Sequence, residues 1–235
     1  MIDVLIMGGT WNPNGDPVTE TFANALDRRR FRYQYVPYPA AYGTPMSYRS
    51  SVGFGKSALV QAIRDSPNPV IVAGYSQGAA VAAEVAAEIE LYPDLDVRAA
   101  ALIACPSRPR GLCVGTDPGG YGVVGELAIT TMPALHAAAF RDPICALPEG
   151  SMLRYLADMS AYMSISSPQE FAQWGASIVD LAVRRRFQRW WEPQNWRDTA
   201  DVIAQANAYL TEGRHTTAYI NEGLCIELAD AVNSL

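Results

Sequence analysis

Ser76 stands in a pentapeptide whose residue types suit nucleophilic catalysis, Gly74-Tyr75-Ser76-Gln77-Gly78. A serine hydroxyl is a weak nucleophile until a base takes its proton, so it must be exposed on a tight turn beside a histidine. Small flanking residues make such a turn possible, and Gly74 and Gly78 bracket Ser76 at this spacing. The pattern predicts Ser76 as the nucleophile of an acyl-transfer reaction, and the alternative is a chance match on a surface loop.

The chain has two histidines, and only one lies where a base is expected. In one common arrangement the catalytic residues follow the chain order serine, acid, histidine. His215, in Gly213-Arg214-His215, comes after every predicted strand and is therefore the predicted base. His136 lies in an apolar, strand-like run before the predicted acid, and we expect it to be a hydrogen-bonded structural residue.

An acid must hold the imidazole in the correct tautomer and stabilise its charged form. Asp142 follows a late predicted strand and is the predicted acid. Asp117, in a loop rich in glycine and proline, is the main alternative. Two further candidates, Asp158 and Asp180, fall inside predicted helices.

Catalysis at a carbonyl also needs amide donors directed at the developing oxyanion. The backbone N–H of Gln77, directly after the nucleophile, is the first predicted donor. Thr10, in the loop after the first predicted strand, is the second, through its N–H and its hydroxyl. Gly8 and Gly9 would let this loop approach closely, although they are equally typical of an ordinary turn.

These residues fall between apolar segments that alternate in character. Strands are predicted at 4–7, 33–36, 69–73, 98–104 and 134–140, and helices at about 17–28, 57–63, 79–89 and 217–232. Alternating strands and helices are typical of an α/β fold with a mainly parallel central sheet flanked by helices. Ser76 would then lie between a strand and a helix.

Residues 151–211 differ from the rest because apolar residues recur at helical spacing without a strand pattern. We interpret this segment as a helical insertion, a candidate lid or linker, within a single domain spanning 1–235. The residues that could wall an acyl groove there are Met152, Met159, Met163, Trp174 and Trp190. Such side chains are also typical of an ordinary core.

Composition narrows the function classes. The chain is 49% hydrophobic and 18% charged, as in a packed globular protein, and its net charge of −6 argues against a nucleic-acid binder. The arginine runs 28–30 and 184–186 are interpreted as solvated helix ends. Two histidines and four scattered cysteines predict neither a metal site nor a disulfide scaffold, and no cofactor is expected. Neither a signal peptide nor a transmembrane segment is expected.

Several motifs together resemble the cutinase-like serine esterases, which have the α/β-hydrolase fold, and in particular the lysin B enzymes of mycobacteriophages. The matching pieces span most of the chain: Gly8-Gly9-Thr10, Tyr38-Pro39-Ala40, Gly74 to Ala79, Asp142-Pro143-Ile144-Cys145, and His215 with Tyr219 and Gly223. The serine and aspartate motifs are the more specific ones. His215 follows Asp142 by 73 positions, an interval similar to that of lysin B and longer than in ordinary cutinases.

The resemblance implies a lipid ester substrate of the mycobacterial cell wall, the ester between mycolic acid and arabinogalactan. It also implies synthesis in the infected host cytoplasm, action at the envelope after release, and a role in cell lysis. Ala139 stands where cutinases carry one cysteine of a disulfide around the acid, so Cys145 is not expected to form that bridge. Two alternatives stay open: a host cutinase-like lipase or acyltransferase, and a virion structural protein with a hydrolase fold.

Overall fold

A parallel sheet forms the centre of the computed structural model of this chain. The structure describes residues 1–151, 153–154, 157 and 212–235, so the predicted insertion at 151–211 and its candidate lid residues lie largely outside the described residues. The five strands pair in the order β2-β1-β3-β4-β5. Their bounds are β1 Ile2–Met7, β2 Phe31–Tyr35, β3 Val70–Tyr75, β4 Val97–Ile103 and β5 Ala134–Ala137.

The central strand β3 is buried along its whole length, as expected for a strand covered on both faces. Its side chains alternate between two apolar clusters. Ile71 and Ala73 belong to one cluster, and Val70 and Val72 belong to the other. The sheet therefore separates two cores, which explains why its central strand β3 is a continuous apolar run.

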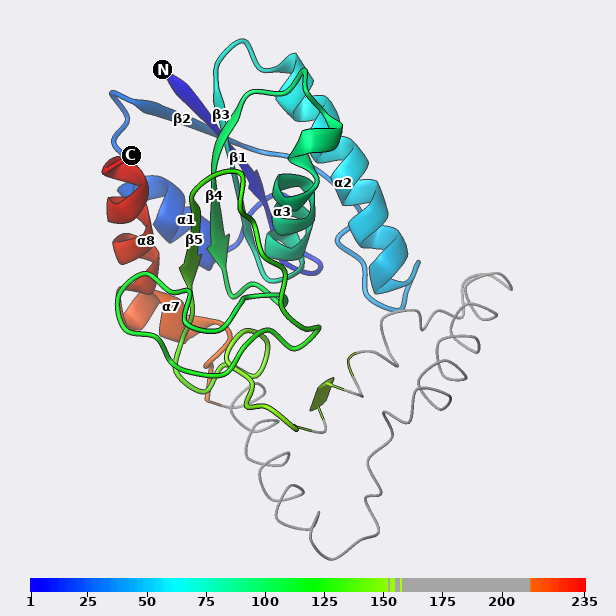
Figure 1. Cartoon of the computed structure of the whole chain (residues 1–235), viewed down its shortest axis with the longest axis vertical. Coiled ribbons are helices and arrows are strands. Elements are labelled where there is room, and N and C mark those ends of the chain that lie inside the picture. Colours follow the sequence, from blue (N-terminus) through cyan, green and yellow to red (C-terminus); the bar gives the residue numbers. More distant parts are fainter. Residues whose placement is uncertain (152, 155–156, 158–211) are drawn as a thin grey trace, which may run out of the picture.

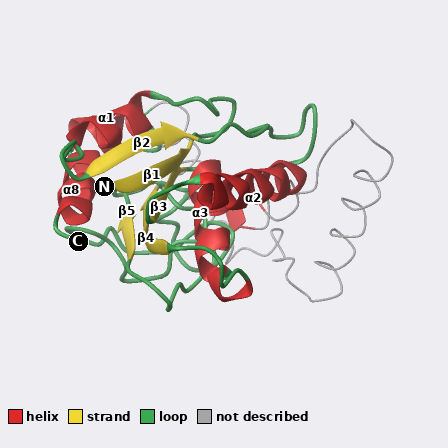
Figure 2. Ribbon diagram, turned by 90° about the horizontal axis from the view of Figure 1, so that it is seen from above, coloured by secondary structure: helices red, strands yellow, loops and turns green. Residues whose placement is uncertain are grey.

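Helices cover both faces of the sheet (Figures 1 and 2). On one face lie α1 (Pro17–Ala25), α7 (Thr217–Asn221) and α8 (Leu224–Asn233). The other face packs against α2 (Tyr48–Asp65) and α3 (Gln77–Ala87), which is followed by the short 3₁₀ helix η1 (Ile89–Leu91). The predicted α/β fold with a parallel sheet between helices is confirmed.

Three helices differ most from the predicted bounds, while α3 begins and ends two residues earlier than predicted. The first ends at Ala25 instead of about 28, because Leu26 is extended and the Asp27 N–H bonds to Asn233 on α8. The second begins at Tyr48 instead of 57, where the Ser47 hydroxyl accepts the Ser50 N–H at 3.1 Å. The predicted closing helix is two helices, because Gly223 adopts a φ of 77° between them.

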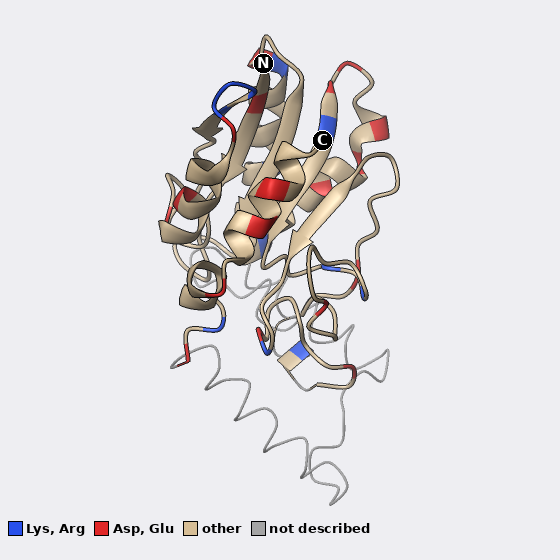
Figure 3. Ribbon diagram, turned by 90° about the vertical axis from the view of Figure 1, so that its left-hand side faces the viewer, with Lys and Arg blue, Asp and Glu red and all other residues tan. Residues whose placement is uncertain are grey.

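Charged residues are dispersed over the described part of the chain. Figure 3 shows the Lys and Arg positions of the described residues scattered over several helices and loops. The run Arg28–Arg30 lies in the turn after α1, where Arg29 pairs with Asp27. Among the described helices, none is both long and apolar enough to cross a bilayer.

Candidate active site

The candidate residues converge at one edge of the sheet because all its strands are parallel. Ser76 follows β3, the loop with Thr10 follows β1, and Asp142 follows β5 by a short loop. The carboxyl ends of parallel strands meet at a single edge, where ligands bind in open α/β sheets. His215 comes from the segment directly before α7. Figure 1 shows α7 beside the carboxyl end of β5.

Ser76 sits on a strained turn that the neighbouring glycines permit. Its φ of 54° and ψ of −116° belong to a region that L-residues rarely adopt. A Cβ on Gly74 would lie 2.3 Å from the Gly78 carbonyl oxygen, and one on Gly78 would lie 2.1 Å from that of Met7. Both glycines are therefore needed for the strand, the turn and the helix to pack.

Ser76, His215 and Asp142 form a continuous hydrogen-bonded chain. His215 Nε2 lies 2.9 Å from Ser76 Oγ, and its Nδ1 lies 3.0 Å from Asp142 Oδ2. The carboxylate is fully buried and the imidazole is 4% exposed. This connectivity lets the ring accept the serine proton while the carboxylate stabilises the imidazolium that results. The structure thus brings together the three residues predicted for nucleophile, base and acid.

Asp142 is held as a carboxylate by the groups around it. Burial acts most strongly and would raise its pKa, but the His215 ring, the Tyr219 hydroxyl and the Ile144 N–H outweigh it, so the pKa lies below its usual value. The Tyr219 hydroxyl donates to Oδ2 at 2.5 Å, and the Ile144 N–H donates to Oδ1 at 2.9 Å. These donors favour the charged form that the acid of a triad requires.

Asp117, the alternative acid, lies elsewhere. Its carboxylate pairs with the fully buried Arg108 guanidinium at 3.0 Å. Arg108 also donates to the carbonyl oxygens of Cys145 and Gly119, so it links the loops that follow β4 and β5. Asp117 therefore belongs to a structural network.

His136 is buried on β5, as expected of a structural residue. The expectation that it is hydrogen-bonded is wrong, because neither ring nitrogen has a partner within the described part of the chain. Burial, with a smaller effect of the Arg108 charge, lowers its pKa to about 4. Sequence could not reveal this isolation, because it depends on the packing around β5.

The two predicted oxyanion donors lie beside the serine turn. No hydrogen bond among the described residues uses the backbone N–H of Thr10 or of Gln77. Gln77 opens α3, and N–H groups at a helix N-terminus favour negative charge. The close approach of Gly78 to the end of β1 places the loop after this strand against the start of α3.

The segment after β2 holds this arrangement in place. The Tyr38 hydroxyl donates to the Gly8 carbonyl at 2.8 Å, and the Trp11 N–H donates to the Ala40 carbonyl at 2.7 Å. The Gln77 side-chain amide donates to the Ala41 carbonyl at 2.9 Å. The motif Tyr38-Pro39-Ala40 therefore braces the loop that carries Thr10.

Two tyrosines of the site were not predicted to have a role. The Tyr75 ring stacks on the His215 imidazole with 5.3 Å between centroids, and its hydroxyl donates to the His215 carbonyl at 2.5 Å. Tyr219 contacts the acid, as described above. No sequence signal indicates either contact, because each joins segments that lie far apart along the chain.

All four cysteines are free thiols, in agreement with the expected loss of the cutinase bridge at Cys145. The Cys145 Sγ lies 3.3 Å from Asp142 Oδ2. Burial and the neighbouring carboxylate raise its pKa well above the usual value, so it stays protonated. Ala139, at the position of the missing cysteine, instead donates its N–H to the Tyr219 hydroxyl at 3.2 Å.

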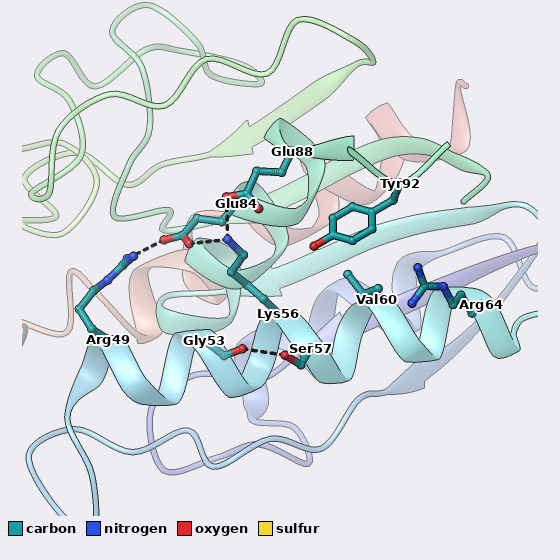
Figure 4. Close-up of a pocket in the computed structure, with 9 residues that line it drawn as sticks. All are labelled: Arg49, Gly53, Lys56, Ser57, Val60, Arg64, Glu84, Glu88 and Tyr92. Atoms are coloured by element: carbon teal, nitrogen blue, oxygen red, sulfur yellow. Dashed lines mark hydrogen bonds and ion pairs between the residues drawn. The ribbon is translucent and has the colours of Figure 1, made fainter. Parts of the chain in front are cut away.

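A separate polar pocket of about 450 Å³ lies between α2 and α3 (Figure 4). Glu84 pairs there with Arg49 and Lys56, and Glu88 pairs with Lys56. None of the triad residues lines this pocket. The described residues contain no group of three His, Cys, Asp or Glu side chains able to hold a metal ion.

A family model described as "Alpha/beta hydrolase family" matches residues 6–231. The chain belongs to the alpha/beta hydrolase family. No curated protein matches this hydrolase in sequence.

Among solved structures, this hydrolase is similar to lysin B from mycobacteriophage D29, with a TM-score of 0.55 and 19% identity over 87% of this chain and 98% of that chain. An acetylxylan esterase is similar with a TM-score of 0.45 and 20% identity, over 76% of this chain and 97% of that chain. A cutinase-like protein from Cryptococcus sp. is similar with a TM-score of 0.44 and 19% identity, over 77% of this chain and 94% of that chain. At these identities the similarity concerns the fold. The family match assigns the chain to the alpha/beta hydrolases, and the structural neighbours share its fold.

Proposed function

We propose that this chain is a serine esterase in which Ser76 is the nucleophile, His215 the base and Asp142 the acid. The observation that carries the proposal is the distance of 2.9 Å between Ser76 Oγ and His215 Nε2, with Nδ1 at 3.0 Å from Asp142. A nucleophile, a base and a group that orients the base are the parts that acyl transfer requires.

In the first half-reaction His215 takes the Ser76 proton while Oγ attacks the ester carbonyl carbon. The tetrahedral intermediate collapses when the bond to the alcohol oxygen breaks, and His215 Nε2 returns the proton to that oxygen. Water then adds to the acyl-enzyme, giving one proton to His215, which passes it to Ser76 as the free acid leaves. Asp142 orients the ring and stays ionised throughout.

The backbone N–H groups of Gln77 and Thr10 are proposed to bind the oxyanion. Their freedom from other hydrogen bonds in the described residues and their place at the serine turn support this role. Donors fixed in advance stabilise a developing charge without reorganisation, and removal of one such donor typically costs about 10²–10³ in kcat.

The acyl part of the substrate is proposed to be a lipid chain. Two large aromatic side chains, Trp11 and Phe140, are 70% and 62% exposed, and each follows the carboxyl end of a strand. Trp11 is adjacent to Thr10. The Phe140 carbonyl accepts a hydrogen bond from Arg214, the neighbour of His215, at 2.7 Å. Exposed apolar surface at a binding site favours an apolar ligand.

The specific substrate we propose is the ester between mycolic acid and arabinogalactan of the mycobacterial envelope, cleaved during phage lysis. The resemblance of the motifs to lysin B and the interval of 73 positions between acid and base support this substrate. The exposed aromatic residues are consistent with a long acyl chain.

The test is hydrolysis of p-nitrophenyl esters of short and long acyl chains by the wild-type protein and by Ser76→Ala. We expect the variant to lose several orders of magnitude in kcat. Release of mycolic acid from purified mycobacterial cell walls then tests the substrate. Activity on soluble esters without release from walls would favour a lipase or acyltransferase. No activity above that of the variant would favour a structural virion protein.

A further inference from the structure

The hydroxyl of Tyr219 connects three parts of the site. It donates to Asp142 Oδ2 at 2.5 Å, accepts the Ala139 N–H at 3.2 Å, and lies 3.1 Å from the Cys145 sulfur. The Tyr219 side chain is fully buried. A tyrosine in this setting has little freedom to turn away from the carboxylate.

Tyr219 and His215 reach the same carboxylate from one short segment. Tyr219 lies in the first turn of α7, four positions after His215, and its N–H donates to the Thr216 carbonyl at 3.2 Å. Both side chains meet Asp142 Oδ2, at 2.5 and 3.0 Å. A displacement of the acid relative to α7 would therefore disturb both contacts together.

Among the described donors to Oδ2, the phenol is the strongest neutral one. The Cys145 thiol lies 3.3 Å away, and a thiol is a weak donor. Burial and the Asp142 charge raise the pKa of Tyr219 well above its usual value, so the hydroxyl keeps its proton and donates it. A short O–H···O⁻ bond is stronger than a bond between neutral groups.

We propose that Tyr219 is a positioning residue of the proposed reaction, which fixes Asp142 as an ionised carboxylate in register with His215. This inference rests on the esterase function proposed above. The tyrosine touches neither the reacting serine nor the carbonyl carbon, and it acts through the acid. Its hydroxyl also accepts the N–H of Ala139, the position where cutinases carry a disulfide cysteine. This hydrogen bond therefore attaches the loop of the acid in place of that disulfide.

The test is Tyr219→Phe, which removes the hydroxyl and keeps the ring. Loss of a hydrogen bond to a charged group predicts a fall in kcat/KM of roughly 10- to 100-fold. Because the Tyr219 hydrogen bond lowers the pKa of Asp142, its loss makes the carboxylate more basic, and the acidic limb of the kcat/KM profile should move to higher pH. A purely structural role would lower kcat/KM at every pH and leave the limb in place.

Tyr48→Phe is the matched control, because the buried Tyr48 hydroxyl has no hydrogen-bond partner within the described residues. It should leave kcat/KM and the acidic limb unchanged. Melting temperatures of both variants separate catalysis from folding. An acidic limb that is unchanged in Tyr219→Phe would overturn the positioning role.

A measurement without substrate separates this inference from the esterase proposal. The His215 Nδ1 proton, shared with Asp142, should give a far-downfield NMR resonance that disappears in His215→Ala. In Tyr219→Phe this resonance should shift or broaden, and in Tyr48→Phe it should not. An unchanged resonance overturns the inference even in a protein that hydrolyses esters. A shifted resonance in a protein with no Ser76-dependent activity would contradict the esterase alone.

Discussion

Tyr75 holds His215 in two ways: its ring stacks on the imidazole, and its hydroxyl donates to the His215 carbonyl at 2.5 Å. Because Tyr75 directly precedes Ser76, the end of β3 positions both the serine and the histidine. A shift of the serine turn would therefore move the contact surface of the base as well. The backbone strain at Ser76 therefore lies at the position that aligns the serine with the histidine.

The backbone strain at Ser76 predicts different stabilities for two inactive variants. Glycine adopts a φ of 54° with ψ of −116° more easily than alanine does, so Ser76→Gly should be more stable than Ser76→Ala by about 1 kcal/mol. Chemical denaturation of both variants gives the free energies of unfolding. If alanine proves equally stable or more stable, the turn is not strained.

Substitution of Asp142 should affect catalysis, whereas substitution of Asp117 should affect mainly stability. Asp142→Asn should lower kcat/KM by about 10³–10⁴, since the amide cannot hold the imidazole in the correct tautomer. Asp117→Asn should change kcat/KM by less than about twofold and cost about 1 kcal/mol of stability, because its partner Arg108 is buried. Ester hydrolysis and denaturation of both variants check this. A large loss of activity in Asp117→Asn would contradict the assignment of the acid.

Two glycines should respond to alanine in opposite directions. In Gly78→Ala the new Cβ would meet the Met7 carbonyl oxygen at 2.1 Å, so a loss of about 3 kcal/mol or more is expected. Gly53 is an exposed position inside α2 with no atom within 4 Å of an added Cβ. Gly53→Ala should therefore gain about 0.5–1 kcal/mol. Thermal melts of the two variants suffice, and similar melting temperatures would contradict the prediction.

His136 should make the fold sensitive to acid. Its pKa is about 4 in the folded chain and near 6.5 when unfolded, so the unfolded state binds a proton first as the pH falls. The neutral form thus contributes stability above pH 6.5 that is lost between pH 6.5 and 4, about 3 kcal/mol in total. Asp142, with a lowered pKa, loses its contribution only at lower pH.

His136→Phe is expected to flatten the dependence of unfolding free energy on pH between 6.5 and 4. The comparison needs denaturation curves of the wild type and the variant at several pH values. An equally steep dependence in the variant would assign the acid sensitivity to other groups.

Trp11 should determine the response to acyl-chain length. In Trp11→Ala, loss of apolar contact should lower kcat/KM for long-chain esters by about tenfold and leave short-chain esters nearly unchanged. Leu91 is a control of similar exposure, 72%, on η1 at the far end of α3. Leu91→Ala should have no effect on either ester. Equal losses on both chain lengths in Trp11→Ala would argue against acyl contact.

The sequence predicted the strand, turn and helix around Ser76 correctly, because Gly74 and Gly78 are required by local sterics. The central strands β1 and β3 were also predictable, since burial on both faces makes them largely apolar runs. The start of α2 was not, because Gly53 and Gly55 lower helix propensity. Gly55 is set by tertiary packing, since an added Cβ would lie 2.8 Å from Val81.

The roles of Tyr75 and Tyr219 could not be read from the sequence alone. Both contacts depend on how the end of β3, the loop after β5 and the segment around α7 pack together at the sheet edge. Residue types alone do not predict this packing. The lack of a hydrogen-bond partner for His136 among the described residues is likewise a property of packing. The candidate triad residues were therefore predictable by type and order, while the tyrosines that contact His215 and Asp142 were not.

The acid and the base are also fastened by the chain on either side of them. Arg141 pairs with Glu212 at 3.3 Å, and Arg214 donates to the Phe140 carbonyl. The two ends of the long intervening stretch are thus clamped side by side. Loop-closure entropy rises by only about 0.6 kcal/mol for each doubling of length. A change in the length of that stretch should therefore cost little closure entropy and leave the alignment of His215 with Asp142 intact.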